Sequence, residues 1–363
     1  MPADSNTWMI YGANGYTGRL IATRAVADGR KPILAGRDAS KIEAVAKELG
    51  CSFRVFSLST AEVTSRHLDG LSAVLHCAGP FSRTAESMIG ACLLAGVDYL
   101  DITGELDVIE FAARQHDLAV AAGISIMPAV GFDVVPSDCL AAKLAAALPA
   151  ASELKLAFRA GSSISPGTAN TMFAGLGYGG RVRKDSHIMR VPTAWKAMQI
   201  RFPSGDRRAV TIPWGDVSSA FHTTRIPNIQ VYAATPTRQI SSWRRWRPLL
   251  PMTKLAPIQW LGRQWIKRHI MGPSDSERAK GHAEFWGRVA DNEGQIAEAT
   301  LITPEGYSLT VLTSLEIVRR TLADEVDPGF STPAKAFGGE FIEQFDKVLF
   351  EWRIVPRERR GVS

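Results

Sequence analysis

The sequence predicts an α/β fold: a doubly wound parallel sheet followed by a second α+β domain built on a mixed sheet. Three observations support this. Short apolar runs alternate with longer amphipathic stretches through the first half, glycines cluster directly after the first run, and strand-like alternation dominates the second half. With 363 residues, of which 45% are hydrophobic, the chain is too long for one ordinary domain, so we expect two.

In the first half, strands are expected at residues 8–11, 32–35, 52–56, 73–77, 97–100 and 123–127, and helices at 17–27, 40–49, 85–95 and 108–121. Strands that alternate with helices in this way run parallel and are joined by right-handed crossovers. Sheets of this kind bind ligands at the carboxyl ends of their strands. The residues that directly follow each strand are therefore the first candidates for a site.

The second half changes in character near residue 151. We expect domains at 1–150 and 151–335, with a C-terminal segment at 336–363 that packs back on the first domain. The strands of the second half are expected at 153–159, 208–213, 229–234, 283–290, 295–303 and 347–355, and its helices around 168–177 and 308–322.

Three glycines follow the first strand in the stretch YGANGYTGRL. Gly12 allows a tight turn, Gly15 lets the backbone approach a phosphate, and Gly18 lets the next helix pack closely on the sheet. Strand, turn and helix together indicate the pyrophosphate loop of a Rossmann-type domain, here spaced GxxGxxG, with a turn that binds no ligand as the alternative. The predicted cofactor contacts in this loop are Gly12, Ala13, Asn14, Gly15, Tyr16, Thr17 and Gly18.

The end of the second strand favours NADP over NAD. Arg37 offers a planar phosphate donor to the 2′-phosphate, and Lys41 adds a second positive charge one helical turn later. Asp38 is a competing ribose ligand, but it stands where a helix N-cap is also expected.

The loop after the fourth strand is expected to run beside the nicotinamide ribose. Its predicted contacts are Ala78, Gly79, Pro80 and Phe81. The alternative is a tight turn that leaves Phe81 in the core.

Five motifs, GANGYTG, AGRDASK, HCAGPF, DYLDITGE and GFDVVPSD, occur in this order, and the chain resembles the saccharopine-dehydrogenase-like family of NADP-binding oxidoreductases. It is most similar to the subgroup of trans-acting enoyl reductases of bacterial polyketide and lipid synthesis, and GPSDSERA, TPEGYSLT and STPAKAFGG extend the resemblance over most of the chain. The resemblance implies an NADP-dependent enzyme of lipid metabolism whose second domain covers the nicotinamide. The implied reaction is reduction of a C=C bond in a hydrophobic acyl or polyketide-like substrate, free or carrier-bound.

Two alternatives stay open. One is a C=N reductase or dehydrogenase of an amino-acid-like substrate, although no cluster for binding an amino-acid dicarboxylate can be identified. The other is a non-catalytic, membrane-associated scaffold that binds NADP. The chain also departs from its relatives at Ser165-Pro166-Gly167-Thr168, where they commonly carry Ser-Gly-Gly-Thr, so this loop is expected to be stiffer.

The expected proton donors are Tyr178 and Asp133, since a reductase needs an acid or a hydrogen-bond donor beside the nicotinamide. Each also has a structural alternative: Tyr178 lies among glycines typical of a lid, and Asp133 stands where a helix cap is expected. Further candidates near the strand ends are Asp101, Thr103, Glu105, Asp138, Lys184 and His187.

Residues 241–270, hereafter the basic Trp-rich segment, contain Trp243, Trp246, Trp260 and Trp265. It lies in a stretch, 217–274, with nine basic residues and no acidic one, and a helix is expected at 258–269. Cations interleaved with tryptophan indicate peripheral contact with an anionic membrane through residues 243–268. The alternatives are a solvated basic face whose tryptophans pack on the domain, and docking to an acidic carrier protein; a nucleic-acid surface is not expected.

Cys51, Cys77, Cys92 and Cys139 show no metal-binding spacing, which indicates reduced thiols. We predict no metal site, no signal peptide and no membrane-spanning run, and hence a cytoplasmic protein with at most peripheral membrane contact.

Overall fold

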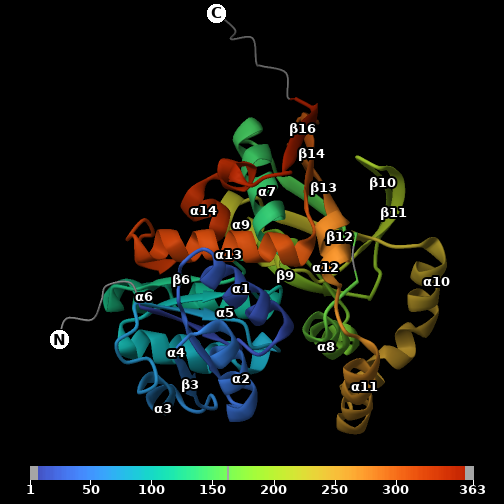
Figure 1. The fold of residues 1–363 in the computed structure, drawn as a ribbon. Helices are drawn as coiled ribbons and strands as arrows, with labels where there is room; N and C mark the ends of the chain where they lie inside the picture. Colours follow the sequence, from blue (N-terminus) through green and yellow to red (C-terminus); the bar gives the residue numbers. More distant parts are fainter. Residues whose placement is uncertain (1–6, 162, 356–363) are drawn as a thin grey trace, which may run out of the picture.

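A computed structural model describes residues 7–161 and 163–355 (Figure 1). The first sheet has seven parallel strands in the order β15-β6-β5-β4-β1-β2-β3. Its strands are β1 (Trp8–Tyr11), β2 (Ile33–Gly36), β3 (Phe53–Val55), β4 (Ala73–His76), β5 (Asp98–Asp101), β6 (Ser125–Met127) and β15 (Gly329–Phe330). Successive strands are added outward from β1 to β3 on one side and from β4 to β6 on the other, which makes this a doubly wound Rossmann-type sheet, as predicted.

Helices cover both faces of the first sheet because side chains alternate along each strand. In β1, Ile10 packs with α1 and α2, whereas Met9 packs with α4 and α5 on the opposite face. The helices of this domain are α1 (Tyr16–Ala27), α2 (Ala39–Leu49), α3 (Ala61–Ser65), the 3₁₀ helix η1 (Phe81–Arg83), α4 (Ala85–Ala95), α5 (Leu106–Arg114), α6 (His116–Ala122) and α7 (Val135–Ala147).

The second sheet is mixed, with the order β10-β11-β12-β7-β13-β14-β16, and a β8–β9 hairpin joins it through β12. Only β7 and β12 pair in parallel within this sheet as described. Its strands are β7 (Glu153–Arg159), β8 (Gly180–Lys184), β9 (His187–Val191), β10 (Ala197–Phe202), β11 (Gly205–Thr211), β12 (Asn228–Ala234), β13 (His282–Ala290), β14 (Ile296–Pro304) and β16 (Leu349–Ile354).

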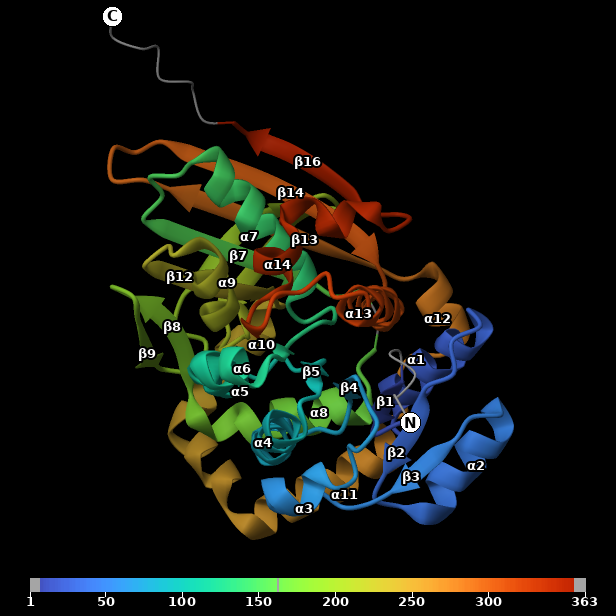
Figure 2. The same cartoon turned by 90° about the vertical axis from the view of Figure 1, so that its left-hand side faces the viewer.

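The helices of the second half are α8 (Pro166–Gly175), η2 (Leu176–Tyr178), α9 (Asp216–Thr224), α10 (Thr237–Trp246), η3 (Arg247–Lys254), α11 (Ala256–His269), α12 (Asp275–Lys280), α13 (Gly306–Leu322), α14 (Pro333–Phe337) and η4 (Gly339–Gln344). Figure 2 shows α9 against the second sheet and α13 between the two sheets. Helices α7 and α9 pack on the second sheet.

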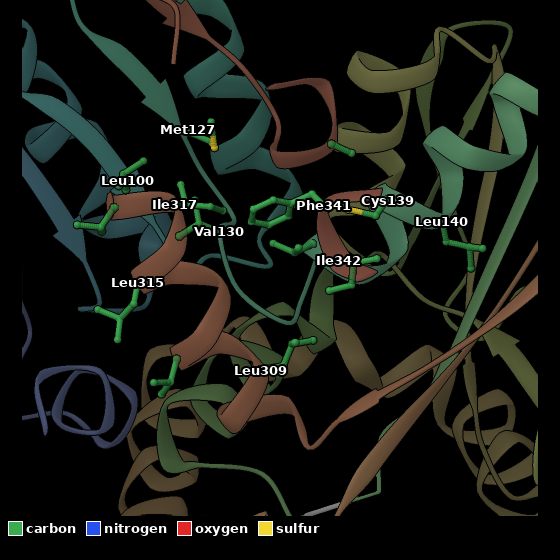
Figure 3. Close-up of a cluster of buried hydrophobic side chains, with 14 of the residues drawn as sticks. Leu100, Met127, Val130, Cys139, Leu140, Leu309, Leu315, Ile317, Phe341 and Ile342 are labelled. Atoms are coloured by element: carbon green, nitrogen blue, oxygen red, sulfur yellow. The ribbon is translucent and has the colours of Figure 1, made fainter. Parts of the chain in front are cut away.

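The two domains share one hydrophobic core. Figure 3 shows Leu100 and Met127 of the first sheet close to Ile317 of α13, with Cys139 of α7 and Phe341 of η4 in the same cluster. Helix α13 therefore closes one face of the first domain although it lies far along the sequence.

The last part of the chain contacts both domains. Strand β15 adds to the first sheet beside β6, and η4 packs on α7. Strand β16 instead pairs with β14 in the second sheet. The C-terminal residues thus tie the two sheets together.

The four cysteines are free thiols. No helix within residues 7–161 and 163–355 is long and apolar enough to cross a membrane. Over the same residues, no group of three or more acidic, histidine or cysteine side chains is placed to hold a metal ion.

Candidate active site

The turn after β1 requires glycine at two positions. Gly12 has φ of +90°, and a Cβ on it would lie 2.9 Å from the Cβ of Ala78. A Cβ on Gly18 would lie 2.4 Å from the carbonyl oxygen of Gly12. Only glycine therefore lets α1 begin this close to the end of β1.

The same turn presents the start of α1 to solvent. Gly15 is the N-cap of α1, and the Arg19 N–H donates to the Gly15 carbonyl oxygen at 2.9 Å. The N–H groups of Tyr16, Thr17 and Gly18 consequently have no acceptor inside the helix. Backbone donors and a helix dipole directed at one point suit a phosphate, so these residues fit the pyrophosphate of NADP.

Arg37 is exposed at the end of β2, and no hydrogen bond or ion pair engages it within the described chain. Asp38 is the N-cap of α2: it accepts from the Lys41 N–H at 3.3 Å and pairs with the Lys41 ammonium at 2.7 Å. Of the two cations predicted to bind the 2′-phosphate, Arg37 is thus available and Lys41 is already paired. The capping role of Asp38 leaves it poorly suited to bind the ribose.

The loop after β4 is fixed by Glu105. One carboxylate oxygen accepts from the Phe81 N–H at 2.7 Å, and the other accepts from the Ser82 N–H at 2.9 Å. The Phe81 side chain is only 9% exposed and lies in the core, against the ring of His76. Any contact of this loop with a cofactor therefore falls to Ala78, Gly79 and Pro80, because Phe81 has both its side chain and its N–H engaged.

Asp133 follows β6 at the carboxyl edge of the first sheet. One of its carboxylate oxygens lies directly over Gly104, where a Cβ would come within 2.7 Å of it. Burial, with a smaller contribution from the neighbouring Glu105, raises the pKa of Asp133 to about 7. No hydrogen bond to the Asp133 carboxyl is found among the described residues, so it does not act as the helix cap considered above.

Tyr307, in the first turn of α13, contacts the loop at the start of α8. Its hydroxyl accepts from the Ser165 N–H at 2.6 Å and lies 3.1 Å from the Thr168 hydroxyl, at the start of α8. Burial raises the pKa of the Tyr307 hydroxyl. The unusual Ser165–Thr168 loop is therefore held against α13.

Tyr16 of the glycine loop connects this region to the second domain. Its ring packs edge-on against Tyr307 with centroids 4.9 Å apart. Its hydroxyl donates to the Pro273 carbonyl oxygen at 2.5 Å and accepts from Arg278 at 2.8 Å. The phosphate loop is thus joined through two tyrosines to the start of α13 and of α8.

Aromatic rings of the second domain lie next to Asp133. Phe132 packs against Phe158 and Phe285, with ring centroids 6.5 and 5.5 Å apart, and Phe158 packs against Trp214 at 4.9 Å. The Trp214 indole N–H donates to the Asp133 carbonyl oxygen at 2.6 Å. This aromatic group gives the region beside Asp133 an apolar wall.

Two other acidic candidates have structural roles. Asp101 is fully buried and accepts from the Tyr99 hydroxyl and from the N–H groups of Thr103 and Ala129, which ties β5 to β6. Asp138 is also fully buried and accepts from the Thr223 hydroxyl and the Ala334 N–H. Both carboxylates are engaged in hydrogen bonds that hold the fold together. The Thr103 hydroxyl is engaged in the same way, because it accepts from the Glu105 N–H.

Tyr178 does not lie with these groups. Its ring is 53% exposed, and the Lys254 ammonium lies 4.3 Å from its centroid. This places Tyr178 beside the basic Trp-rich segment and argues against its predicted role as a proton donor. Lys184 and His187 are exposed in the β8–β9 hairpin, which likewise removes them from the candidates.

Some site residues were not identified as such from the sequence. Tyr307 and Arg278 lie in the motifs TPEGYSLT and GPSDSERA, so the motifs signalled their segments but not their contacts. No pattern indicated Trp214.

Comparison with known proteins supports the assignment of the first domain as an NADP-binding domain. Residues 8–127 match the family model of the saccharopine dehydrogenase NADP binding domain. A Mycobacterium tuberculosis protein provisionally described as a trans-acting enoyl reductase is 36% identical over 139 residues, and the trans-acting enoyl reductase of Mycobacterium leprae is 34% identical over 138 residues. Each of these matches covers 36% of this chain and 33% of the relative, so the similarity spans a third of the length of these relatives.

The whole fold also has a solved counterpart. Saccharopine dehydrogenase (L-Glu forming) of Saccharomyces cerevisiae superposes with a TM-score of 0.64 at 11% sequence identity, covering 95% of this chain and 99% of the other. This likeness establishes the two-domain α/β fold.

Proposed function

We propose that this protein is an NADPH-dependent reductase, because residues 8–127 match the family model of the saccharopine dehydrogenase NADP binding domain. The proposed reaction is reduction of a C=C bond in a hydrophobic acyl or polyketide-like substrate, free or carrier-bound. The observation that carries the proposal is the Asp133 carboxyl, whose pKa is raised to about 7, beside an aromatic wall at the carboxyl edge of the sheet.

The chain's own residues fit the cofactor. The N–H groups at the start of α1 would hold the pyrophosphate, and Arg37 would bind the 2′-phosphate as a planar donor. When bound, NADPH supplies a hydride.

Asp133 would supply the matching proton. With a pKa of about 7 it is partly protonated at neutral pH, which suits a general acid. In an enoyl reduction this proton goes to the α-carbon after the β-carbon has received the hydride. Phe132, Phe158 and Trp214 would exclude water and contact the apolar part of the substrate.

An amino-acid-like substrate is supported less well. Its carboxylates would require uncompensated cations near Asp133. Arg278, which contacts Tyr16, pairs with Asp275 at 2.5 Å, and Arg159, which follows Phe158, pairs with Glu284 at 3.3 Å. The apolar wall is better matched to an acyl chain.

The test is NADPH oxidation with a panel of enoyl thioesters and cyclic imines. Asp133→Asn should lower kcat on the preferred enoyl substrate by about 100-fold or more while NADPH still binds. Tyr178→Phe is the matched control and should keep wild-type kcat. Turnover of imines alone would contradict the enoyl assignment, and unchanged kcat in Asp133→Asn would contradict the role of Asp133.

A further inference from the structure

Helices α10 and α11, joined by η3, form a projecting arm made of the basic Trp-rich segment. Figure 1 shows the arm at one edge of the molecule, with α10 next to β10 and β11 and with α11 beside α8. Pro248 and Pro251 fall in η3, and Pro257 lies in the first turn of α11, so one continuous helix cannot form here. The arm therefore consists of two helices with a bend between them.

One side of α10 anchors the arm to the second domain. Ile240 and Trp243 pack with Ala194 and Val210. Arg244 and Arg247 both donate to the Ala194 carbonyl oxygen, at 3.0 and 2.7 Å. Trp243 and these two arginines thus hold the arm on the second domain. For these three residues the alternative in which the segment packs on its own domain is correct.

One face of α11 is anchored on α8. Ile266 is buried, and Gly262 lies so close to Phe173 that a Cβ would come within 2.2 Å of its ring. Beside this contact is an open hollow of about 470 Å³, lined in part by Phe173, Ile258, Leu261 and Trp265. On the opposite face of α11, Trp260, Lys267 and Arg268 are exposed among the residues that the structure describes.

The outer side of the arm is strongly apolar. Its large apolar side chains are between 50% and 60% exposed: Trp246, Leu249, Met252, Leu255, Trp260, Leu261 and Trp265. Single exposed apolar residues are common on soluble proteins, but this many in one short segment indicate an interaction site.

Unpaired cations accompany these apolar side chains. In the described chain no ion pair or hydrogen bond engages Arg238, Arg245, Arg263, Lys267 and Arg268. On α11, Trp260 and Leu261 lie in the first half of the helix, and Lys267 and Arg268 lie in its last turn. The surface therefore presents both aromatic rings and free positive charge.

We propose that the basic Trp-rich segment binds the surface of an anionic lipid bilayer, with α11 lying in the interface. Tryptophan and leucine would enter the headgroup region, and the free lysine and arginines would contact lipid phosphates. A second copy of this chain would bring the same positive charges face to face. An acidic carrier protein would pair the cations but leave the exposed tryptophans and leucines without an apolar partner.

The experiment is co-sedimentation of the full-length protein with vesicles of phosphatidylglycerol and phosphatidylcholine, compared with vesicles of phosphatidylcholine alone. Wild type should bind the anionic vesicles, and less so as salt is raised. Trp260→Ala with Trp265→Ala should weaken binding at least about tenfold. Lys267→Gln with Arg268→Gln should weaken it roughly 10- to 30-fold.

Matched controls separate the arm from the rest of the surface. Trp352→Ala removes an exposed tryptophan of β16, and Lys31→Gln with Lys47→Gln removes two exposed charges of the first domain. Both should bind vesicles as wild type does. Quenching of tryptophan fluorescence by brominated acyl chains should occur in wild type and be reduced in the Trp260/Trp265 variant.

Three outcomes would overturn the proposal. The first is failure of wild type to bind anionic vesicles. The second is binding that the charge variant loses but the tryptophan variant keeps, which would indicate electrostatic adsorption to lipid without α11 lying in the interface. The third is equal weakening in the arm variants and the matched controls.

Discussion

Among single residues, Arg37 has the most direct consequence for cofactor choice. It is exposed and unpaired in the described chain, so Arg37→Ala should remove a charged contact to the 2′-phosphate without disturbing the fold. NADPH binding should weaken by roughly 10- to 100-fold, with NADH binding nearly unchanged. Titration by quenching of tryptophan fluorescence measures both.

Lys41→Gln serves as the comparison for Arg37. Because Lys41 already pairs with Asp38, its loss should affect NADPH binding less. Equal weakening of NADPH and NADH in Arg37→Ala would show that this residue does not read the 2′-phosphate.

Asp133 should make stability depend on pH. Its pKa of about 7 lies above the ~3.9 of an unfolded aspartate, so between these values the folded state holds the extra proton. This group therefore lowers stability as pH rises from about 4 to about 7. Asp133→Asn should be more stable than wild type by roughly 1–3 kcal/mol at pH 8, with the gain lost near pH 4. Urea unfolding at both pH values measures this, and a gain independent of pH would argue against the raised pKa.

At the scale of elements, the contact between β1 and α1 depends on Gly18. Gly18→Ala would place a methyl group 2.4 Å from the Gly12 carbonyl oxygen, in a turn that cannot move without shifting β1 or α1. We expect a loss of about 2 kcal/mol or more, together with weaker NADPH binding. Gly175→Ala at the end of α8 meets nothing within 4 Å and should leave both unchanged. Thermal unfolding with and without NADPH compares the two, and a Gly18→Ala protein as stable as the control would contradict the close approach.

Strands β1, β4 and β6 could be predicted because they are buried along their whole length and read as largely apolar runs. The two-residue strand β15 was not predicted. Strands β8, β9 and β10 were not predicted: β9 is mostly exposed and mixes charged with apolar residues, so it has no clear period. The helix expected at 108–121 is divided at Gln115 into α5 and α6. Helix α9 was not predicted because its buried positions include Ser218 and Ser219, which are polar and give no hydrophobic periodicity.

The candidate site was predictable to the extent that it lies next to strand ends. The glycine loop, Arg37 and Asp133 all follow strands of the first sheet, and local patterns identify such residues. The pairing of Tyr16 with Tyr307 joins residues far apart in sequence, which no local pattern encodes. Tyr178 was predicted because its phenol could donate a proton, but its ring is exposed and contacts Lys254 of the arm.

For the whole molecule, the shared core predicts a single folding unit. Leu309, Leu315 and Ile317 of α13 lie in the same cluster as Leu100 and Val130 of the first domain. The full chain should unfold in one calorimetric transition, whereas a fragment of residues 1–150 should show no cooperative transition, because this face of its sheet would be exposed to water. A fragment that unfolds cooperatively and binds NADPH like the full chain would refute this.

Strand β15 and helix α13 also bear on how the protein is made. The first sheet receives its last strand from residues 329–330, near the end of the chain. On a ribosome, the nucleotide-binding half emerges first but cannot be completed until almost all of the second half has been synthesised. A chain cut short by premature termination before this point would expose unfinished apolar surface to chaperones and proteases, so cofactor binding would distinguish finished molecules from truncated ones.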